Sequence, residues 1–190
     1  ALAAASMSAS AMWAANAATV SPAPDTADGR THLTVANLRT MAHRSHEWAG
    51  TLAQLRIAFA DQRQFAVHDP VPPAYGDEGA ANHMRLTSKH GEAGLEFFVY
   101  GVTGGAFPAR QHLQASKAIA RLHGLDPDRT LFVEQSEAAI AAGASHNEVL
   151  PVPNENFLFA HELAVADGGE VVAFCEQRLP GFELVEVPAA

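Results

Sequence analysis

Cysteine and lysine are both scarce in this chain of 190 residues. Its single cysteine, Cys175, cannot form an internal disulfide, which favours a reducing, cytoplasmic setting. Only Lys89 and Lys117 are lysines among the 12 basic residues, and 21 acidic residues give a formal net charge of −9. Binding to nucleic acid without regard to sequence needs clustered cations, so we expect no nucleic-acid partner. The remaining cations are arginines, which are suited to bidentate recognition of carboxylates.

Long apolar runs are also missing. No stretch of about 18 apolar residues occurs, so we expect no membrane-spanning segment. Residues 1–18 are small and apolar, but they lack the positively charged start of a secretory signal peptide. The chain does not begin with methionine, and residues 182–188 alternate like a strand that stops abruptly, so we expect cuts at both ends. A hydrophobic content of 48% excludes intrinsic disorder and suits one domain, or a large part of one.

The spacing of apolar residues predicts an α/β fold with a mixed sheet. The clearest helix spans residues 109–123, because its apolar residues recur at helical spacing from Ala115 to Leu122 and Gly124 follows as a stop. Other helices are predicted over 48–60 and from Ser136, as its cap, to Ala142. Loops are predicted over 22–29, 68–79 and 101–108. Strands are predicted over 17–21, 32–35, 95–100, 130–134, 148–152, 156–159, 171–174 and 182–187. The order strand, strand, helix, strand recurs without a linker or a convincing sequence repeat.

Two carboxylates, two glycines and a histidine crowd into residues 76–83. Glycine allows close approach of a backbone to a ligand, and the carboxylates of Asp77 and Glu78 can bind a cation or hold an imidazole. In the alternative interpretation, this segment is a turn whose carboxylates cap a following helix.

His146 follows a glycine-terminated helix and is expected to open a strand. Its ordinary pKa of about 6.5 suits general acid–base catalysis. The alternative is a surface histidine beside a turn.

Arg110 is predicted at the start of the helix over 109–123, where the helix dipole favours acids rather than bases. This placement therefore predicts binding of an anionic partner. The alternative is a solvated Arg110 without a functional role. His43 and His46, with Glu47 beside them, suggest a metal site; a helix start with Ser45 as cap explains them equally well. Cys175 lies in an apolar run that predicts a buried, unreactive strand thiol. No nucleophile elbow or phosphate loop is present, so the residues alone identify no nucleophile.

Together, these segments resemble the N-succinylarginine dihydrolase family, in order and along nearly the whole chain. The resemblance rests on residues 8–22, 25–30, 43–45, 59–62, 76–83, 94–98, 108–111 and 146–147. Family members are much longer, so residues 1–190 are expected to form a single, incomplete part of a catalytic domain.

The resemblance implies a partial pentein-type α/β propeller built from ββαβ modules. It also implies hydrolysis of N2-succinyl-L-arginine by two waters to N2-succinyl-L-ornithine, two ammonia and carbon dioxide, in arginine catabolism by the succinyltransferase route. No metal or organic cofactor is expected. A homodimer in the cytoplasm is expected of the full-length protein.

The resemblance also implies the site residues. Glu78 and His146 match two members of a Cys-His-Glu catalytic triad, whose cysteine lies outside this chain. The matching substrate-binding positions are Asn16, His43, Arg44, Arg110 and, with Glu where the family often has Asp, Glu148. The fragment alone is expected to be inactive. The alternatives are an arginine deiminase-like guanidine hydrolase and a non-catalytic ligand-binding or metal-binding module.

Overall fold

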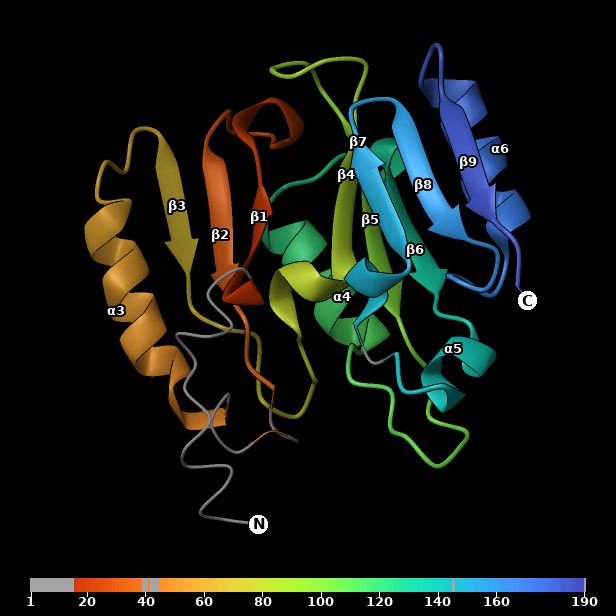
Figure 1. The fold of residues 1–190 in the computed structure, drawn as a ribbon. Helices are drawn as coiled ribbons and strands as arrows, with labels where there is room; N and C mark the ends of the chain where they lie inside the picture. The colour runs from red at the N-terminus through yellow and green to blue at the C-terminus, as the bar shows by residue number, and fades with distance from the viewer. Residues whose placement is uncertain (1–15, 39–40, 42–44, 145, 190) are drawn as a thin grey trace.

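Three small sheets stand side by side in the computed structural model, which describes residues 16–38, 41, 45–144 and 146–189 (Figure 1). The first sheet contains β1 (Ala18–Ser21), β2 (Thr31–Val35) and β3 (Phe65–His68). The second contains β4 (His83–Leu86), β5 (Leu95–Tyr100) and β6 (Thr130–Glu134). The third contains β7 (Pro151–Asn154), β8 (Phe157–His161) and β9 (Glu183–Val187).

Each sheet is built in the same way. Its middle strand runs antiparallel to the first strand and parallel to the third. A helix connects the two parallel strands of each sheet: α3 (Trp48–Ala58), α4 (Leu113–Leu122) and α6 (Gly168–Arg178). The described chain is therefore three successive ββαβ modules, which confirms the recurring order expected from the sequence.

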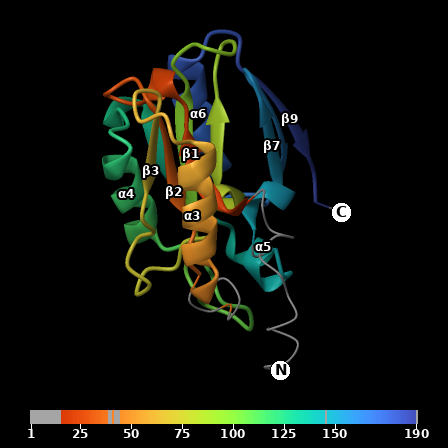
Figure 2. The ribbon, with the colours of Figure 1, turned by 90° about the vertical axis from the view of Figure 1, so that its left-hand side faces the viewer.

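Short helices lie within and between these modules in the described part of the chain. They are α5 (Glu137–Ala141) and the 3-10 turns η2 (Ala23–Asp25), η3 (Gly79–Asn82), η4 (Pro127–Arg129) and η5 (Asn147–Val149). Figure 2 shows α3 in front of β2 and β3, so this helix covers the outer side of the first sheet. Within the described ranges, no helix has the length and apolar character needed to cross a bilayer.

β5 is the central strand of the molecule, and both of its faces are buried. Phe97 points into one apolar cluster with Val133 and Leu158, and Phe98 points into another with Ile119 of α4. A strand covered on both faces needs a continuous apolar run rather than alternation, which explains why residues 95–100 were predicted correctly.

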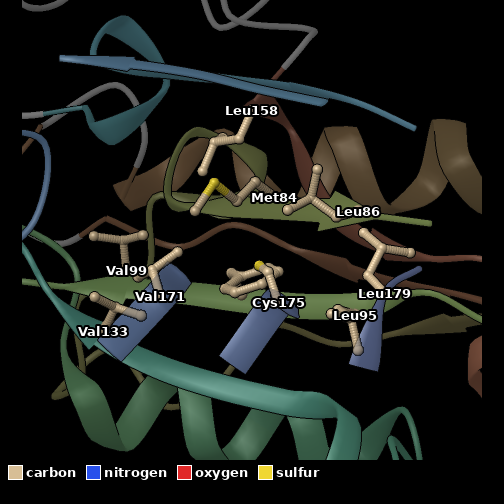
Figure 3. Packing of buried hydrophobic residues seen from close by; sticks show 10 residues of the cluster. Met84, Leu86, Leu95, Val99, Val133, Leu158, Val171, Cys175 and Leu179 are labelled. Carbon is tan, nitrogen blue, oxygen red and sulfur yellow. The ribbon is translucent and has the colours of Figure 1, made fainter. Parts of the chain in front are cut away.

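The strand predicted over residues 171–174 is wrong, because these residues lie within α6. The Asp167 side chain accepts a hydrogen bond from the Glu170 N–H at 3.0 Å and so caps this helix. Val171, Cys175 and Leu179 recur every four residues and are all buried in the core against the second sheet (Figure 3). The two adjacent valines at the start of the segment were mistaken for a strand, although burial follows the helical period.

The helix predicted over 109–123 begins only at Leu113. His112, directly before the helix, is extended, and tertiary bonds hold the preceding segment: Gly101 N–H donates to the Gln111 carbonyl at 3.1 Å, and His112 N–H donates to the Gly76 carbonyl at 2.9 Å. Arg110 is therefore not at a helix N-terminus, and the argument from the helix dipole is wrong. The stop at Gly124 is confirmed, with φ at +64°.

Other boundaries differ by shorter distances. β3 and β4, each of four residues, were not predicted. The strand expected over 148–152 begins at Pro151, because Asn147–Val149 forms η5, and His146 consequently precedes a turn rather than opening a strand. Ser136 does precede α5, but its side chain makes no capping hydrogen bond.

Candidate active site

Five of the seven predicted site residues meet in space, although they come from segments far apart in the sequence. Glu78 precedes η3, Arg110 lies in the non-helical segment before α4, and His146 precedes η5. Asn16 lies just before β1, and Glu148 lies within η5. η3 and η5 contact each other, which brings the Glu78 carboxylate close to the His146 imidazole. The other two predicted residues, His43 and Arg44, lie outside the described residues.

Glu78 and His146 form the centre of this site. The Glu78 side chain is fully buried, and its Oε2 lies 3.3 Å from His146 Nε2. Arg110 Nη1 donates to Glu78 Oε1 at 3.2 Å and lies 3.5 Å from His146 Nε2. A buried carboxylate needs a cationic or donor partner, and here the guanidinium and the imidazole share that role.

A second carboxylate flanks the other side of the imidazole. Glu148 Oε1 lies 3.5 Å from His146 Nδ1, and Asn16 Nδ2 donates to the same oxygen at 3.1 Å. The Glu148 side chain is half-exposed, whereas Asn16 is buried. Each ring nitrogen of His146 therefore faces a carboxylate, an arrangement in which the imidazole can take up and release protons.

Three successive backbone N–H groups in the loop that carries Glu78 each donate a hydrogen bond to a different acceptor. Asp77 N–H donates to the Asn37 carbonyl at 3.4 Å, Glu78 N–H to Gln111 Oε1 at 2.7 Å, and Gly79 N–H to Asp77 Oδ1 at 3.1 Å. The Glu78 side chain makes no capping bond to η3, so the helix-capping interpretation is wrong for this carboxylate. Its carboxylate is directed into the site.

The two glycines of this loop allow neighbouring site segments to approach. Gly79 has a φ of +72°, and a Cβ at this position would lie 2.4 Å from the Asn16 carbonyl oxygen. A Cβ at Gly76 would lie 2.3 Å from the Arg110 carbonyl oxygen. The close approach expected of these glycines is thus made to other parts of the chain that carry site residues.

Comparison with known proteins identifies the family of this chain. The whole chain, residues 1–190, matches the family described as succinylarginine dihydrolase. The chain belongs to the succinylarginine dihydrolase family. It is 64% identical over 189 residues to the N-succinylarginine dihydrolase of Novosphingobium aromaticivorans and 66% identical over 183 residues to that of Sphingopyxis alaskensis. These alignments cover 100% and 96% of the chain, but only 45% and 44% of the relatives. The chain therefore spans less than half the length of these curated relatives.

A solved structure shares the fold. The substrate-bound N-terminal domain of ArgZ, an arginine dihydrolase from the ornithine-ammonia cycle in cyanobacteria, superposes with a TM-score of 0.59. Sequence identity is 17%, and the match covers 93% of this chain and 53% of that one. At this identity, the similarity concerns the fold of this succinylarginine dihydrolase family member and not its chemistry.

Cys175 is separate from the site. It lies in α6, within the apolar core, and burial together with nearby Glu176 raises the pKa of its thiol to about 12. A thiol with this pKa stays protonated near neutral pH and is a poor nucleophile. The predicted strand was wrong, but the predicted buried, unreactive thiol is consistent with this environment. Among the residues that the structure describes, no group of three or more His, Cys, Asp or Glu could hold a metal ion.

Two residues around the site were not singled out from the sequence. Gln111 accepts a hydrogen bond from the Glu78 N–H, and the Asn37 carbonyl accepts one from Asp77. Neither contact has a signal in local spacing, because each joins segments brought together only by the fold. The position of Gln111 directly after Arg110 was the one feature of the sequence that placed Gln111 near the site.

Proposed function

We propose that the full-length protein hydrolyses N2-succinyl-L-arginine, with two waters, to N2-succinyl-L-ornithine, two ammonia and carbon dioxide in arginine catabolism. Membership of the succinylarginine dihydrolase family supports this reaction. The observation that carries the proposal is the meeting of Glu78, His146 and Arg110. His146 Nε2 lies 3.3 Å from one Glu78 carboxylate oxygen, and Arg110 Nη1 lies 3.2 Å from the other. The fragment alone is proposed to be inactive, because it supplies no suitable nucleophile.

Glu78 and His146 are proposed to act as the catalytic carboxylate and proton shuttle. The guanidinium carbon is a poor electrophile, so the reaction needs a thiolate nucleophile and a carboxylate that holds the cation. Glu78 can orient the imidazole or bind the substrate guanidinium, and His146 would pass protons to the leaving ammonia and from the attacking water. Because the thiol of Cys175 has a pKa near 12, we propose that the nucleophilic cysteine lies in the remainder of the longer protein.

Arg110, Asn16, Glu148, His43 and Arg44 are proposed to bind substrate. Succinylarginine carries two carboxylates, and the guanidinium groups of Arg44 and Arg110 are suited to hold them. Arg110 Nη1 contacts Glu78 Oε1 at 3.2 Å, at the carboxylate where a substrate guanidinium would bind. Two cations would compete for one carboxylate, so we propose that Arg110 turns from Glu78 towards a substrate carboxylate when succinylarginine binds.

The architecture of the full protein is proposed to be a pentein-type α/β propeller, of which residues 1–190 form an incomplete part of one catalytic domain. Three successive ββαβ modules support this architecture. So does an apolar row across the third sheet, where Val152 pairs with Phe159 and Phe159 with Val185. These three side chains are 55%, 44% and 45% exposed, as expected of a face that further chain covers. We further propose a homodimer in the cytoplasm, on the family resemblance and the lone reduced cysteine.

Steady-state assays of the full-length protein with N2-succinyl-L-arginine and with free arginine test this function. Release of ammonia and succinylornithine from succinylarginine, with kcat/KM at least 100-fold above that for arginine, is the expected result. A preference for arginine would instead indicate an arginine deiminase-like hydrolase. Absence of turnover with both substrates, in a protein that binds succinylarginine, would indicate a non-catalytic ligand-binding module.

A further inference from the structure

Gln111 is a buried polar residue that lies one position after Arg110 and touches the loop of Glu78. Its side chain is 3% exposed. Its Oε1 accepts a hydrogen bond from the Glu78 N–H at 2.7 Å, and its Nε2 donates to Ser116 Oγ at 3.1 Å. Both polar ends of the amide are therefore occupied within the protein, without direct contact to the Glu78 carboxylate.

The orientation of this amide is determined by its two partners. A backbone N–H can only donate, so the oxygen of Gln111 must face Glu78 and the nitrogen must face Ser116, whose hydroxyl can accept. Ser116 is fully buried on α4, a helix that Ala115 and Ile119 anchor in the core against Phe98. The position of the Glu78 backbone is thereby tied to a rigid element rather than to a solvent-exposed loop.

The same short segment holds the loop of Glu78 from a second side. His112 N–H donates to the Gly76 carbonyl at 2.9 Å, and the carbonyl of Gln111 accepts from Gly101 N–H at 3.1 Å. Residues 110–112 thus supply Arg110 to the site and also fix the loop on which the Glu78 carboxylate is carried. The separation of these two charged groups depends on this segment.

We infer that Gln111 is a positioning residue for the proposed reaction, holding the Glu78 backbone so that its carboxylate meets His146 and Arg110. The inference rests on the proposed function and adds to it a residue that touches none of the reacting atoms. Displacement of a catalytic group by about 1 Å can lower turnover by about 100-fold. Loss of the Gln111 acceptor should therefore act on kcat more than on KM.

Three variants of the full-length protein test this inference. Gln111→Leu removes the acceptor and should lower kcat for succinylarginine by about 10- to 100-fold, with KM within about threefold of wild type. Gln111→Glu keeps an oxygen facing the Glu78 N–H and, when protonated, a donor to Ser116; it should recover kcat to within about fivefold. Ser116→Ala removes only the group that orients the amide and should give an intermediate loss.

The matched control is Thr34→Val, which removes a buried side-chain hydrogen bond of Thr34 Oγ1 to His123 Nε2, 2.7 Å long, in the first sheet. It should lose stability while keeping wild-type kcat. Turnover of Gln111→Leu within twofold of wild type, an equal loss in Thr34→Val, or a change in KM alone would overturn the inference. If Gln111→Leu does not fold, Ser116→Ala decides, and an unchanged kcat in that variant would overturn it.

Amide hydrogen exchange separates this inference from the proposed reaction. The Glu78 N–H should exchange at least tenfold faster in Gln111→Leu than in wild type, and should be protected again in Gln111→Glu, whatever substrate the enzyme uses. An unchanged exchange rate would overturn the positioning role. Absence of succinylarginine turnover in the wild-type protein would count against the proposed function alone.

Discussion

Arg110 shows how much depends on the placement of a single guanidinium. Its Nη1 lies 3.2 Å from Glu78 Oε1 and 3.5 Å from His146 Nε2. A cation in this position neutralises a carboxylate that has no access to water, and it is also close enough to reach a bound anion. The binding role proposed for it therefore concerns a side chain that already contributes to the electrostatics of the free site.

Replacement of this residue gives the first prediction. Arg110→Ala in the full-length protein should raise KM for succinylarginine about tenfold or more, because a charge-assisted hydrogen bond contributes about 1.5–3 kcal/mol. The fall in kcat should be smaller. Steady-state kinetics measure both, with Arg129→Ala as the control, since Arg129 donates to the carbonyls of Ala93 and Gly94. An unchanged KM would remove Arg110 from substrate binding.

Gly79 allows a second prediction at the residue scale. Gly79→Ala should destabilise the full-length protein and lower turnover at least tenfold, because the new Cβ would lie 2.4 Å from the Asn16 carbonyl oxygen and displace the loop of Glu78. Gly91→Ala is the matched control. The φ of Gly91 is +86°, and a Cβ added at this position would have nothing within 4 Å. This variant should lose about 1–2 kcal/mol from the left-handed conformation alone and keep normal turnover. Equal effects of the two variants, by urea denaturation and kinetics, would contradict this account.

At the scale of elements, α6 encloses the one cysteine of the chain in the core. Cys175→Ala in the full-length protein should lose about 1 kcal/mol of stability and retain wild-type kcat, because the thiol packs in the core and its pKa is near 12. Urea denaturation and steady-state assays measure the two effects. Abolished turnover in a folded variant would make Cys175 the nucleophile and contradict the assignment of that role to another part of the longer protein.

The elements differ in how far local sequence predicts them. β5 and α4 were recognised because burial of both faces, or of one helical face, leaves a clear apolar pattern in the sequence. α6 was missed because adjacent valines resemble a strand, while the decisive spacing, from Val171 to Cys175 to Leu179, becomes visible only with the buried face known. The start of α4 was misplaced because tertiary hydrogen bonds to Gly76 and Gly101 keep the preceding residues out of the helix.

The candidate site, like the elements, could be predicted from the sequence only in part. The residue types of Glu78 and His146 suggested chemistry, and their assignment to one site came from the family resemblance rather than from spacing. No local pattern predicts that these two residues meet, because their contact depends on how the second and third modules pack. The contact of Gln111 with Glu78 was not foreseen either, because it joins segments of the second module that only the fold brings together.

At the scale of the whole molecule, three imidazoles gather where α4 meets the first sheet. The ring of His123 lies 5.4 Å from that of His32 and 5.6 Å from that of His68. Its nitrogens contact Ser21 Oγ at 2.8 Å and Thr34 Oγ1 at 2.7 Å. Burial, with the neighbouring histidines His32, His68 and His83, lowers the pKa of His123 to about 2.

This cluster predicts acid sensitivity of folding. An unfolded histidine has a pKa of about 6.5, so below that pH the unfolded chain binds a proton that folded His123 does not. The contribution of His123 to the free energy of unfolding is thus fully present above pH 6.5. It falls by about 1.4 kcal/mol per pH unit below that pH. Between pH 7 and pH 5, urea denaturation of the full-length protein should show a loss about 2 kcal/mol larger in wild type than in His123→Gln. An equal loss in both would contradict the prediction.

The central claim is that Glu78 and His146 act as one unit in a single site. A double-mutant cycle on the full-length enzyme, measured as kcat for succinylarginine, tests it most directly. Glu78→Gln and His146→Asn should each lower kcat by about 100-fold or more, and the double variant should be no slower than the slower single variant. Independent effects, with the double variant reduced by the product of the two losses, or near-normal turnover of either single variant, would contradict the account.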